Sequence, residues 1–171
     1  MTGAPFLLAF LTLQRLAELA IARANTARLL ARGAVEHGRG HYPLIVAFHT
    51  LWLAGLWIAG WDRPLWLPAL PVFVLLQAAR LWVLATLGRR WTTRIIVVPG
   101  ERLAATGPFR FVRHPNYWIV AGEILTVPLI LGLPAYAVVA TIVHAGVLWI
   151  RIRAEEAALA QAIPARAEVS A

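Results

Sequence analysis

Residues 115–150 have the sequence PNYWIVAGEILTVPLILGLPAYAVVATIVHAGVLWI. Two apolar runs, 115–131 and 134–150, flank the short segment Leu131-Gly132-Leu133-Pro134. That segment is too short to form more than a turn, so the two runs predict antiparallel helices joined as a hairpin. Apolar runs that approach about 20 residues are typical of helices that cross a membrane.

Three more apolar runs precede the hairpin, at 5–24, 43–60 and 65–87. The composition agrees with a membrane location, because 60% of the 171 residues are hydrophobic and 14% are charged, against roughly 45–50% and 25% in soluble proteins. The first run lacks a basic leading segment and a convincing cleavage site, so we expect a retained helix and no signal peptide. The sequence predicts one all-α integral membrane domain, 1–171, with five transmembrane helices.

All sixteen basic residues are arginine, and the formal net charge is +8. Most of these arginines lie in three segments: the loop after the first run, the loop 88–114, and the tail after residue 150. The remaining connections hold only Arg63. Five spans put the three basic segments on one side of the membrane, and the positive-inside rule makes that side the cytoplasm. We therefore expect an external N-terminus and a cytoplasmic C-terminus, and topology explains the charge better than nucleic-acid binding does.

The chain has no cysteine, which excludes disulfides, thiol catalysis and cysteine-based metal sites. The five histidines are scattered. His49 has no second potential ligand three or four residues away, so we expect a hydrogen-bonded core residue there. No metal site is predicted.

The loop 88–114 leads into the fourth span. The residues 95–99 predict a short extended piece. Proline is favourable at the first position of a helix, so we expect the helix to begin at Pro115 and to leave the N–H groups of Asn116 and Tyr117 free. Such a helix start attracts anions, and Arg110 and Arg113 add positive charge. A cytoplasmic stop signal with snorkelling arginines fits the same pattern, and the local sequence leaves both interpretations open.

The tail is expected to continue the fifth span as a helix over 151–163. Arg151 and Glu155 are four residues apart and share a helix face with Leu159, whereas Glu156 lies about 100° round the helix. In stabilising surface pairs the acid comes first, and here the base comes first. A stabilising surface ion pair is therefore a weak explanation for the spacing of Arg151 and Glu155. A solvated helix end remains the alternative to a functional role.

Two motifs resemble the isoprenylcysteine carboxyl methyltransferase family, integral membrane enzymes that use S-adenosylmethionine. The first is Gly107-Pro108-Phe109-Arg110-Phe111-Val112-Arg113-His114-Pro115-Asn116-Tyr117, and the second is Arg151-x-x-x-Glu155-Glu156-x-x-Leu159. The resemblance is strongest over 102–159. Residues 14–19 and 38–42 are more similar to a bacterial branch, which includes relatives of alkylpyrone and alkylresorcinol O-methyltransferases.

The resemblance implies an O-methyltransferase of the bacterial inner membrane, dependent on S-adenosylmethionine. Its acceptor would be a lipophilic or prenylated molecule in the bilayer, with either an isoprenylcysteine-type carboxylate or the hydroxyl of a phenolic or alkylpyrone lipid. A phospholipid or another small amphiphile is the alternative acceptor. A transporter or a non-enzymatic scaffold is the alternative class of protein.

The resemblance also implies a cytoplasmic cofactor pocket between the first motif and the helical tail. The expected cofactor-binding residues are Arg113, His114, Pro115, Asn116, Tyr117, Trp118, Glu155 and Glu156. The helix start would meet the cofactor's carboxylate, the two glutamates its cationic groups, and the two aromatic rings its adenine. The expected catalytic residues are Arg151, to aim a carboxylate acceptor, and His114 or Glu155, to act as base for a hydroxyl. A Rossmann domain is excluded, since no glycine-rich strand–helix turn is present.

Ionisable and amide side chains also fall inside the spans. These are Gln14, Arg15, Glu18, Gln77, Arg80 and Glu123. Charges at membrane depth are costly and are usually paired or functional, so we expect a network within the bundle, or else the lining of an acceptor tunnel. Glu123 needs a partner, for which His144 is a candidate.

Overall fold

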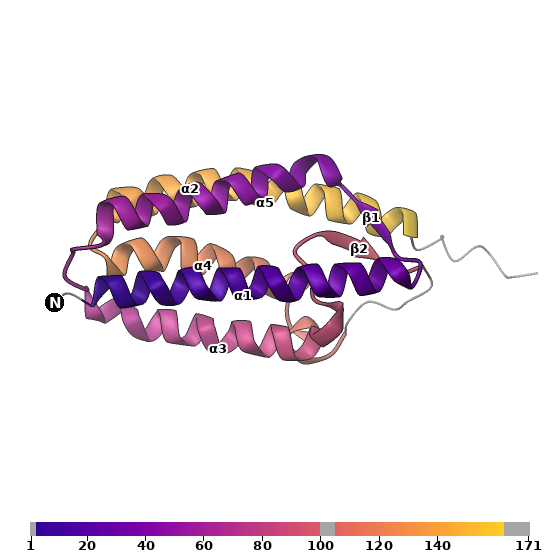
Figure 1. Cartoon of the computed structure of the whole chain (residues 1–171), viewed down its shortest axis with the longest axis horizontal. Helices are drawn as coiled ribbons and strands as arrows, with labels where there is room; N and C mark the ends of the chain where they lie inside the picture. The colour runs from indigo at the N-terminus through magenta and orange to yellow at the C-terminus, as the bar shows by residue number, and fades with distance from the viewer. Residues whose placement is uncertain (1–2, 100–104, 163–171) are drawn as a thin grey trace, which may run out of the picture.

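The computed structural model describes residues 3–99 and 105–162, with side chains as far as Leu159 in the last helix. These residues form five α-helices, namely α1 (Ala4–Ala31), α2 (Tyr42–Gly60), α3 (Leu70–Leu87), α4 (Pro115–Ile130) and α5 (Pro134–Ala162). The helices run along one long axis as a bundle (Figure 1). The predicted all-α class is confirmed.

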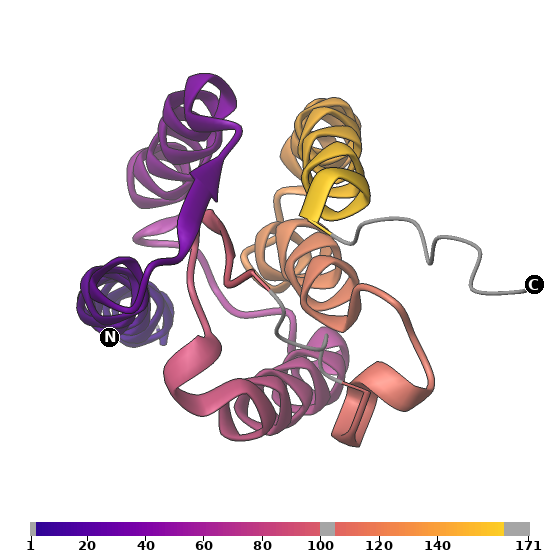
Figure 2. The ribbon, with the colours of Figure 1, turned by 90° about the vertical axis from the view of Figure 1, so that its right-hand side faces the viewer.

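The C-terminal hairpin is formed by α4 and α5, as the apolar runs predict. Gly132 turns the chain with a φ of 65°, a conformation that glycine adopts without strain. The Leu133 N–H donates to the Pro128 carbonyl (2.8 Å) and closes the turn. Seen along the bundle axis, α4 lies between α3 and α5 and faces α1 (Figure 2), and half of its residues are buried. It packs mainly against α3 and α5.

Among the described residues, four helical segments are long and apolar enough to cross a membrane: Ala4–Ala31, Arg39–Gly60, Leu67–Arg90 and Pro134–Leu159. α4 has 16 residues, which corresponds to about 24 Å and is shorter than a hydrocarbon core of about 30 Å. The structure therefore supports four of the five predicted spans by length and composition.

Two predicted boundaries are corrected. α1 continues to Ala31, beyond the predicted end at residue 24. Its polar last turns are stabilised by packing, because the Asn25 side-chain amide donates to the carbonyls of Trp91 (2.8 Å) and Gly88 (3.2 Å). The third run begins as a 3₁₀ turn over Leu67–Ala69 and becomes α-helical only at Leu70.

A two-stranded antiparallel sheet joins the α1–α2 and α3–α4 loops. β1 (Val35–His37) pairs with β2 (Ile95–Val97), with Val35 opposite Val97, which confirms the predicted extended piece. The Glu36 carboxylate accepts a hydrogen bond from Arg94 (2.9 Å) and pairs with Arg39 (3.2 Å). We call this end of the molecule, at the right in Figure 1, the strand end of the bundle.

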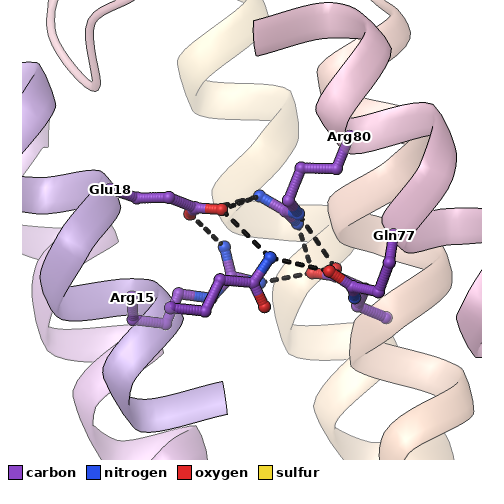
Figure 3. A network of polar contacts seen from close by, with 6 residues as sticks. Arg15, Glu18, Gln77 and Arg80 are labelled. Carbon is purple, nitrogen blue, oxygen red and sulfur yellow. Dashed lines mark hydrogen bonds and ion pairs between the residues drawn. The ribbon is translucent and has the colours of Figure 1, made fainter. Parts of the chain in front are cut away.

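Within the bundle, the ionisable side chains form one network (Figure 3). The Arg80 guanidinium, 2% exposed, donates to Glu18 (3.0 Å) and to Glu123 (Nε to Oε1, 3.0 Å). Arg15 binds the same two carboxylates, Glu18 at 2.8 Å. Gln77 donates to Glu123 (2.7 Å) and accepts from Gln14 (2.7 Å). The predicted network is confirmed, with two positive and two negative charges.

The partner suggested for Glu123 is wrong. Glu123 points toward α1 and α3, where Arg15 and Arg80 meet it. His144 packs against α2 instead, with its ring 5.3 Å from Phe48 and 5.9 Å from His49 between centroids.

Candidate active site

Four side chains of the two motifs meet at the strand end. Tyr117 donates its hydroxyl hydrogen to the Glu155 carboxylate, and Arg151 Nε donates to the Tyr117 oxygen (2.8 Å). The His114 ring stacks on Tyr117, with centroids 5.2 Å apart and 15° between planes. His114 Nδ1 lies 4.0 Å from Glu155 Oε1. We call these four residues the motif cluster.

Helix periodicity explains how the motif cluster forms. Arg151 and Glu155 are four residues apart on α5, so they project from one helix face. His114 directly precedes α4, and Tyr117 lies in the first turn of that helix. Pro115 occupies the first helical position, as predicted. The Tyr117 N–H is not free, however, because it donates to the His114 carbonyl (3.1 Å). The helix start therefore offers an anion fewer donors than the sequence predicts.

A cavity of about 320 Å³ lies against the motif cluster, and we call it the loop cavity. Seven of the predicted site residues line it: Arg113, His114, Pro115, Asn116, Tyr117, Arg151 and Glu155. Much of the remaining wall comes from 91–98, including strand β2. The sequence marked this segment as extended but gave no sign that it belongs to the site, because its position depends on pairing with β1.

Trp118 and Glu156 are not among the residues that line the loop cavity. Trp118 is 72% exposed, since it follows Tyr117 by about 100° round the helix. The Glu156 carboxylate lies 3.8 Å from Arg113 Nη1; the Arg113 side chain is largely exposed and that of Glu156 is half-buried. Glu155 is thus the acid that faces the cavity.

A second, larger cavity of about 520 Å³ lies between α1, α2, α4 and α5, and we call it the helix cavity. Apolar side chains form most of its wall. It shares five lining residues with the loop cavity: Trp91, Thr92, Asn116, Tyr117 and Arg151. Tyr117 and Arg151 therefore stand where the two cavities adjoin.

The helix cavity has lining residues that are also on the outer surface of the bundle. Leu16 of α1 and Val46, Thr50 and Ala54 of α2 are exposed and line it. The three α2 residues are spaced by four, so they form a stripe along one face of the helix. We call the opening between this stripe and Leu16 the lateral mouth.

Two polar atoms of the motif cluster are ready for a ligand. His114 Nε2 and Arg151 Nη1 are buried and have no hydrogen-bond partner among the described residues. Buried polar groups are nearly always hydrogen-bonded, so each such atom needs an explanation.

Within the residues that the structure describes, no group of three histidine, aspartate or glutamate side chains is arranged to hold a metal ion.

Comparison with known proteins gives the family. Residues 69–161, more than half of the chain, match the sequence model of the isoprenylcysteine carboxyl methyltransferase (ICMT) family. The chain belongs to the ICMT family. The matched region includes both motifs, so the motif cluster of this ICMT-family protein lies inside it, and the recognised resemblance is confirmed. The family assigns the protein to the membrane methyltransferases.

Two relatives match over most of their length. The ICMT-family chain is 38% identical to the uncharacterized protein YpbQ of Bacillus subtilis (strain 168), over 90% of this chain and 94% of the relative. It is 24% identical to an uncharacterized protein of Haemophilus influenzae, over 88% of this chain and 91% of the relative. No solved structure shows a significant match.

Proposed function

We propose that the protein is an S-adenosylmethionine-dependent O-methyltransferase that acts on a lipid-like acceptor in the membrane. The observation that carries the proposal is the position of Tyr117 and Arg151, which line both cavities. Two ligands of different chemistry could meet at these residues, one from the strand end and one from between the helices. Methyl transfer needs this arrangement, because donor and acceptor must be held in line and kept from water.

The residues of the loop cavity fit S-adenosylmethionine, which when bound supplies the methyl group. Glu155 offers a carboxylate to its cationic groups, and Arg113 offers a cation to its carboxylate. Ile95, Val97, Phe109 and Leu159 provide an apolar wall for adenine. The unpartnered His114 Nε2 and Arg151 Nη1 would be satisfied by polar atoms of the two ligands.

The helix cavity fits an acceptor that enters from the bilayer through the lateral mouth. At the motif cluster, Arg151 would aim the acceptor oxygen. A carboxylate is already nucleophilic and needs only this positioning, whereas a phenol or enol also needs a base, for which His114 and Glu155 are at hand. Both acceptor classes fit the motif cluster itself.

Cofactor binding is expected to depend on Glu155 and His114. Loss of a charge-assisted hydrogen bond costs about 1.5–3 kcal/mol, so Glu155→Gln or His114→Ala should weaken S-adenosylhomocysteine binding roughly 10- to 100-fold. Titration calorimetry on the protein in detergent measures this. Glu156→Gln, a change at a neighbouring glutamate that does not line the cavity, is the matched control and should bind normally.

Unchanged affinity in both folded variants would remove this assignment. Failure of the folded parent protein to bind S-adenosylhomocysteine would refute the proposed function and leave the transporter or scaffold alternatives.

Access through the lateral mouth gives a second expectation. Ala54→Trp should obstruct the mouth and raise the KM for a lipid acceptor at least tenfold, because a large ring replaces a methyl group on a lining position. Cofactor affinity should not change. Ala47→Trp is the matched control, since Ala47 is an exposed residue of the same helix that does not line the cavity. Equal KM values for the two variants would contradict lateral entry.

We also propose that α4 is a fifth span, which places the strand end in the cytoplasm and the N-terminus outside. The basic segments then lie on the cytoplasmic side. Reporter fusions at Arg63 should be external and those at Arg94 cytoplasmic. A cytoplasmic Arg63 fusion or an external Arg94 fusion would overturn this topology.

A further inference from the structure

The helix cavity contains a band of polar side chains well below the motif cluster. Arg15, Glu18, His49, Arg80 and His144 all line this cavity. On α5, His144 lies seven residues before Arg151, and on α4, Glu123, which binds Arg15 and Arg80, lies six residues after Tyr117. A helix rises 1.5 Å per residue, so this layer is about 10 Å deeper than the motif cluster. We call these five residues the polar belt.

The polar belt has hydrogen-bonding capacity that the protein itself does not use. Arg15 donates from both terminal nitrogens to Glu18 and Glu123, but its Nε is buried and has no partner among the described residues. His49 Nδ1 lies 2.8 Å from the Ile45 carbonyl. A carbonyl only accepts, so Nδ1 carries the proton and the neutral ring keeps a lone pair on Nε2. Arg15 and His49 thus contribute one donor and one acceptor to the belt.

The charge of the surrounding network limits what can bind there. Arg15 and Arg80 are matched by Glu18 and Glu123, so these four groups leave no excess charge to pair with an ion. An ionic ligand in an apolar cavity would lack a counter-charge. An uncharged hydroxyl or carbonyl would instead satisfy Arg15 Nε, and a hydroxyl would also satisfy His49 Nε2. A plain hydrocarbon chain would leave both unsatisfied.

We propose that the polar belt binds an uncharged hydroxyl or carbonyl group of the acceptor, about 10 Å deeper than the oxygen that is methylated. This inference rests on the proposed function and defines its acceptor class. The acceptor is an amphiphile oxygenated at two separate places, not a single head group on a plain isoprenoid or alkyl chain.

Three probes test the proposal: hexadecanoic acid and its 9-hydroxy and 3-hydroxy derivatives. With the carboxylate at Arg151, the 9-hydroxyl reaches the polar belt and the 3-hydroxyl does not. Binding of each tritiated acid to the protein in phosphatidylcholine nanodiscs is measured against empty nanodiscs, which corrects for partition into lipid. We expect the 9-hydroxy acid to bind at least tenfold more tightly than the other two.

His49→Phe keeps the ring volume and should abolish this preference, whereas His49→Gln, which retains a hydrogen-bonding group, should keep part of it. Leu51→Met, at an exposed position of α2 that does not line the cavity, is the control and should keep the full preference. Equal or absent binding of the three acids, or a preference that survives His49→Phe, overturns the proposal.

S-adenosylhomocysteine binding, measured on the same samples, distinguishes failure of the proposed function from failure of the polar belt proposal. If the parent protein prefers the 9-hydroxy acid but binds no S-adenosylhomocysteine, the proposed function fails and the polar belt stands as a ligand site. If it binds S-adenosylhomocysteine without that preference, only the polar belt proposal fails.

Discussion

Arg151→Lys is expected to lose roughly 100-fold or more in turnover while S-adenosylhomocysteine binds within about threefold of the parent affinity. Arg151 Nε is already committed to the Tyr117 oxygen (2.8 Å), and Nη1 is buried without a partner among the described residues. One planar guanidinium can therefore fix Tyr117 and direct an acceptor oxygen together. A lysine ammonium is a single point charge on a flexible chain and cannot hold both directions. Small errors in alignment are costly for an in-line transfer.

The measurement is a methyl-transfer assay on a lipid acceptor together with calorimetric cofactor titration. Arg153→Lys is the matched control, because Arg153 lies on the same helix over the Trp149 ring (5.2 Å) and lines neither cavity. It should keep full activity. Normal turnover of Arg151→Lys would mean that the Arg151 side chain only extends to the membrane–water interface, which a lysine side chain does equally well. A large loss of cofactor affinity would place Arg151 on the cofactor rather than the acceptor.

Arg80→Met is expected to reduce the free energy of unfolding by about 3–5 kcal/mol, the usual cost of breaking a buried ion pair. Arg80 binds Glu18 and Glu123 at once, and its removal leaves two buried carboxylates with Arg15 as the one remaining cation of the network. Thermal or SDS-induced unfolding of the purified protein gives the measurement. Arg32→Met, an exposed arginine at the end of α1, should change stability by no more than about 0.5 kcal/mol.

The double variant Arg80→Met, Glu123→Leu makes this prediction sharper. It removes one charge of each sign and leaves the neutral Arg15–Glu18 pair, so most of the lost stability should return. Additive destabilisation in the double variant would show that the network stabilises by shape and packing instead of by charge balance.

Much of the fold could be predicted from the sequence because helices in a membrane satisfy their own backbone hydrogen bonds, so a long apolar run already specifies the element. Part of the motif cluster was predictable for a similar reason. Arg151 and Glu155 have a spacing that fixes a shared face within one helix, whereas His114 precedes α4, and its place in the site was implied by the family resemblance.

The rotation of each helix against its neighbours was not predictable. Apolar side chains surround these helices on nearly every side, so no polar face marks which side meets the lipid. Glu123 was therefore given the wrong partner, and Trp118 was expected at a cavity that it does not line. The β1–β2 pairing joins residues about 60 positions apart along the chain and has no local signature. That pairing supplies the wall of the loop cavity that the sequence missed.

The division of charge among the helices has a consequence for biogenesis. Of the four charges in the network, α1 contributes the balanced pair Arg15 and Glu18, whereas α3 brings the single charge of Arg80 and α4 the opposite charge of Glu123. During synthesis α3 is made before α4, so the second carboxylate that binds Arg80 arrives only with the helix that occupies the middle of the bundle. In the proposed five-span topology, α4 therefore brings the charge that neutralises Arg80, and α5 completes the packing afterwards. A chain that stops before α4 would keep one unbalanced cation among the buried side chains of the network.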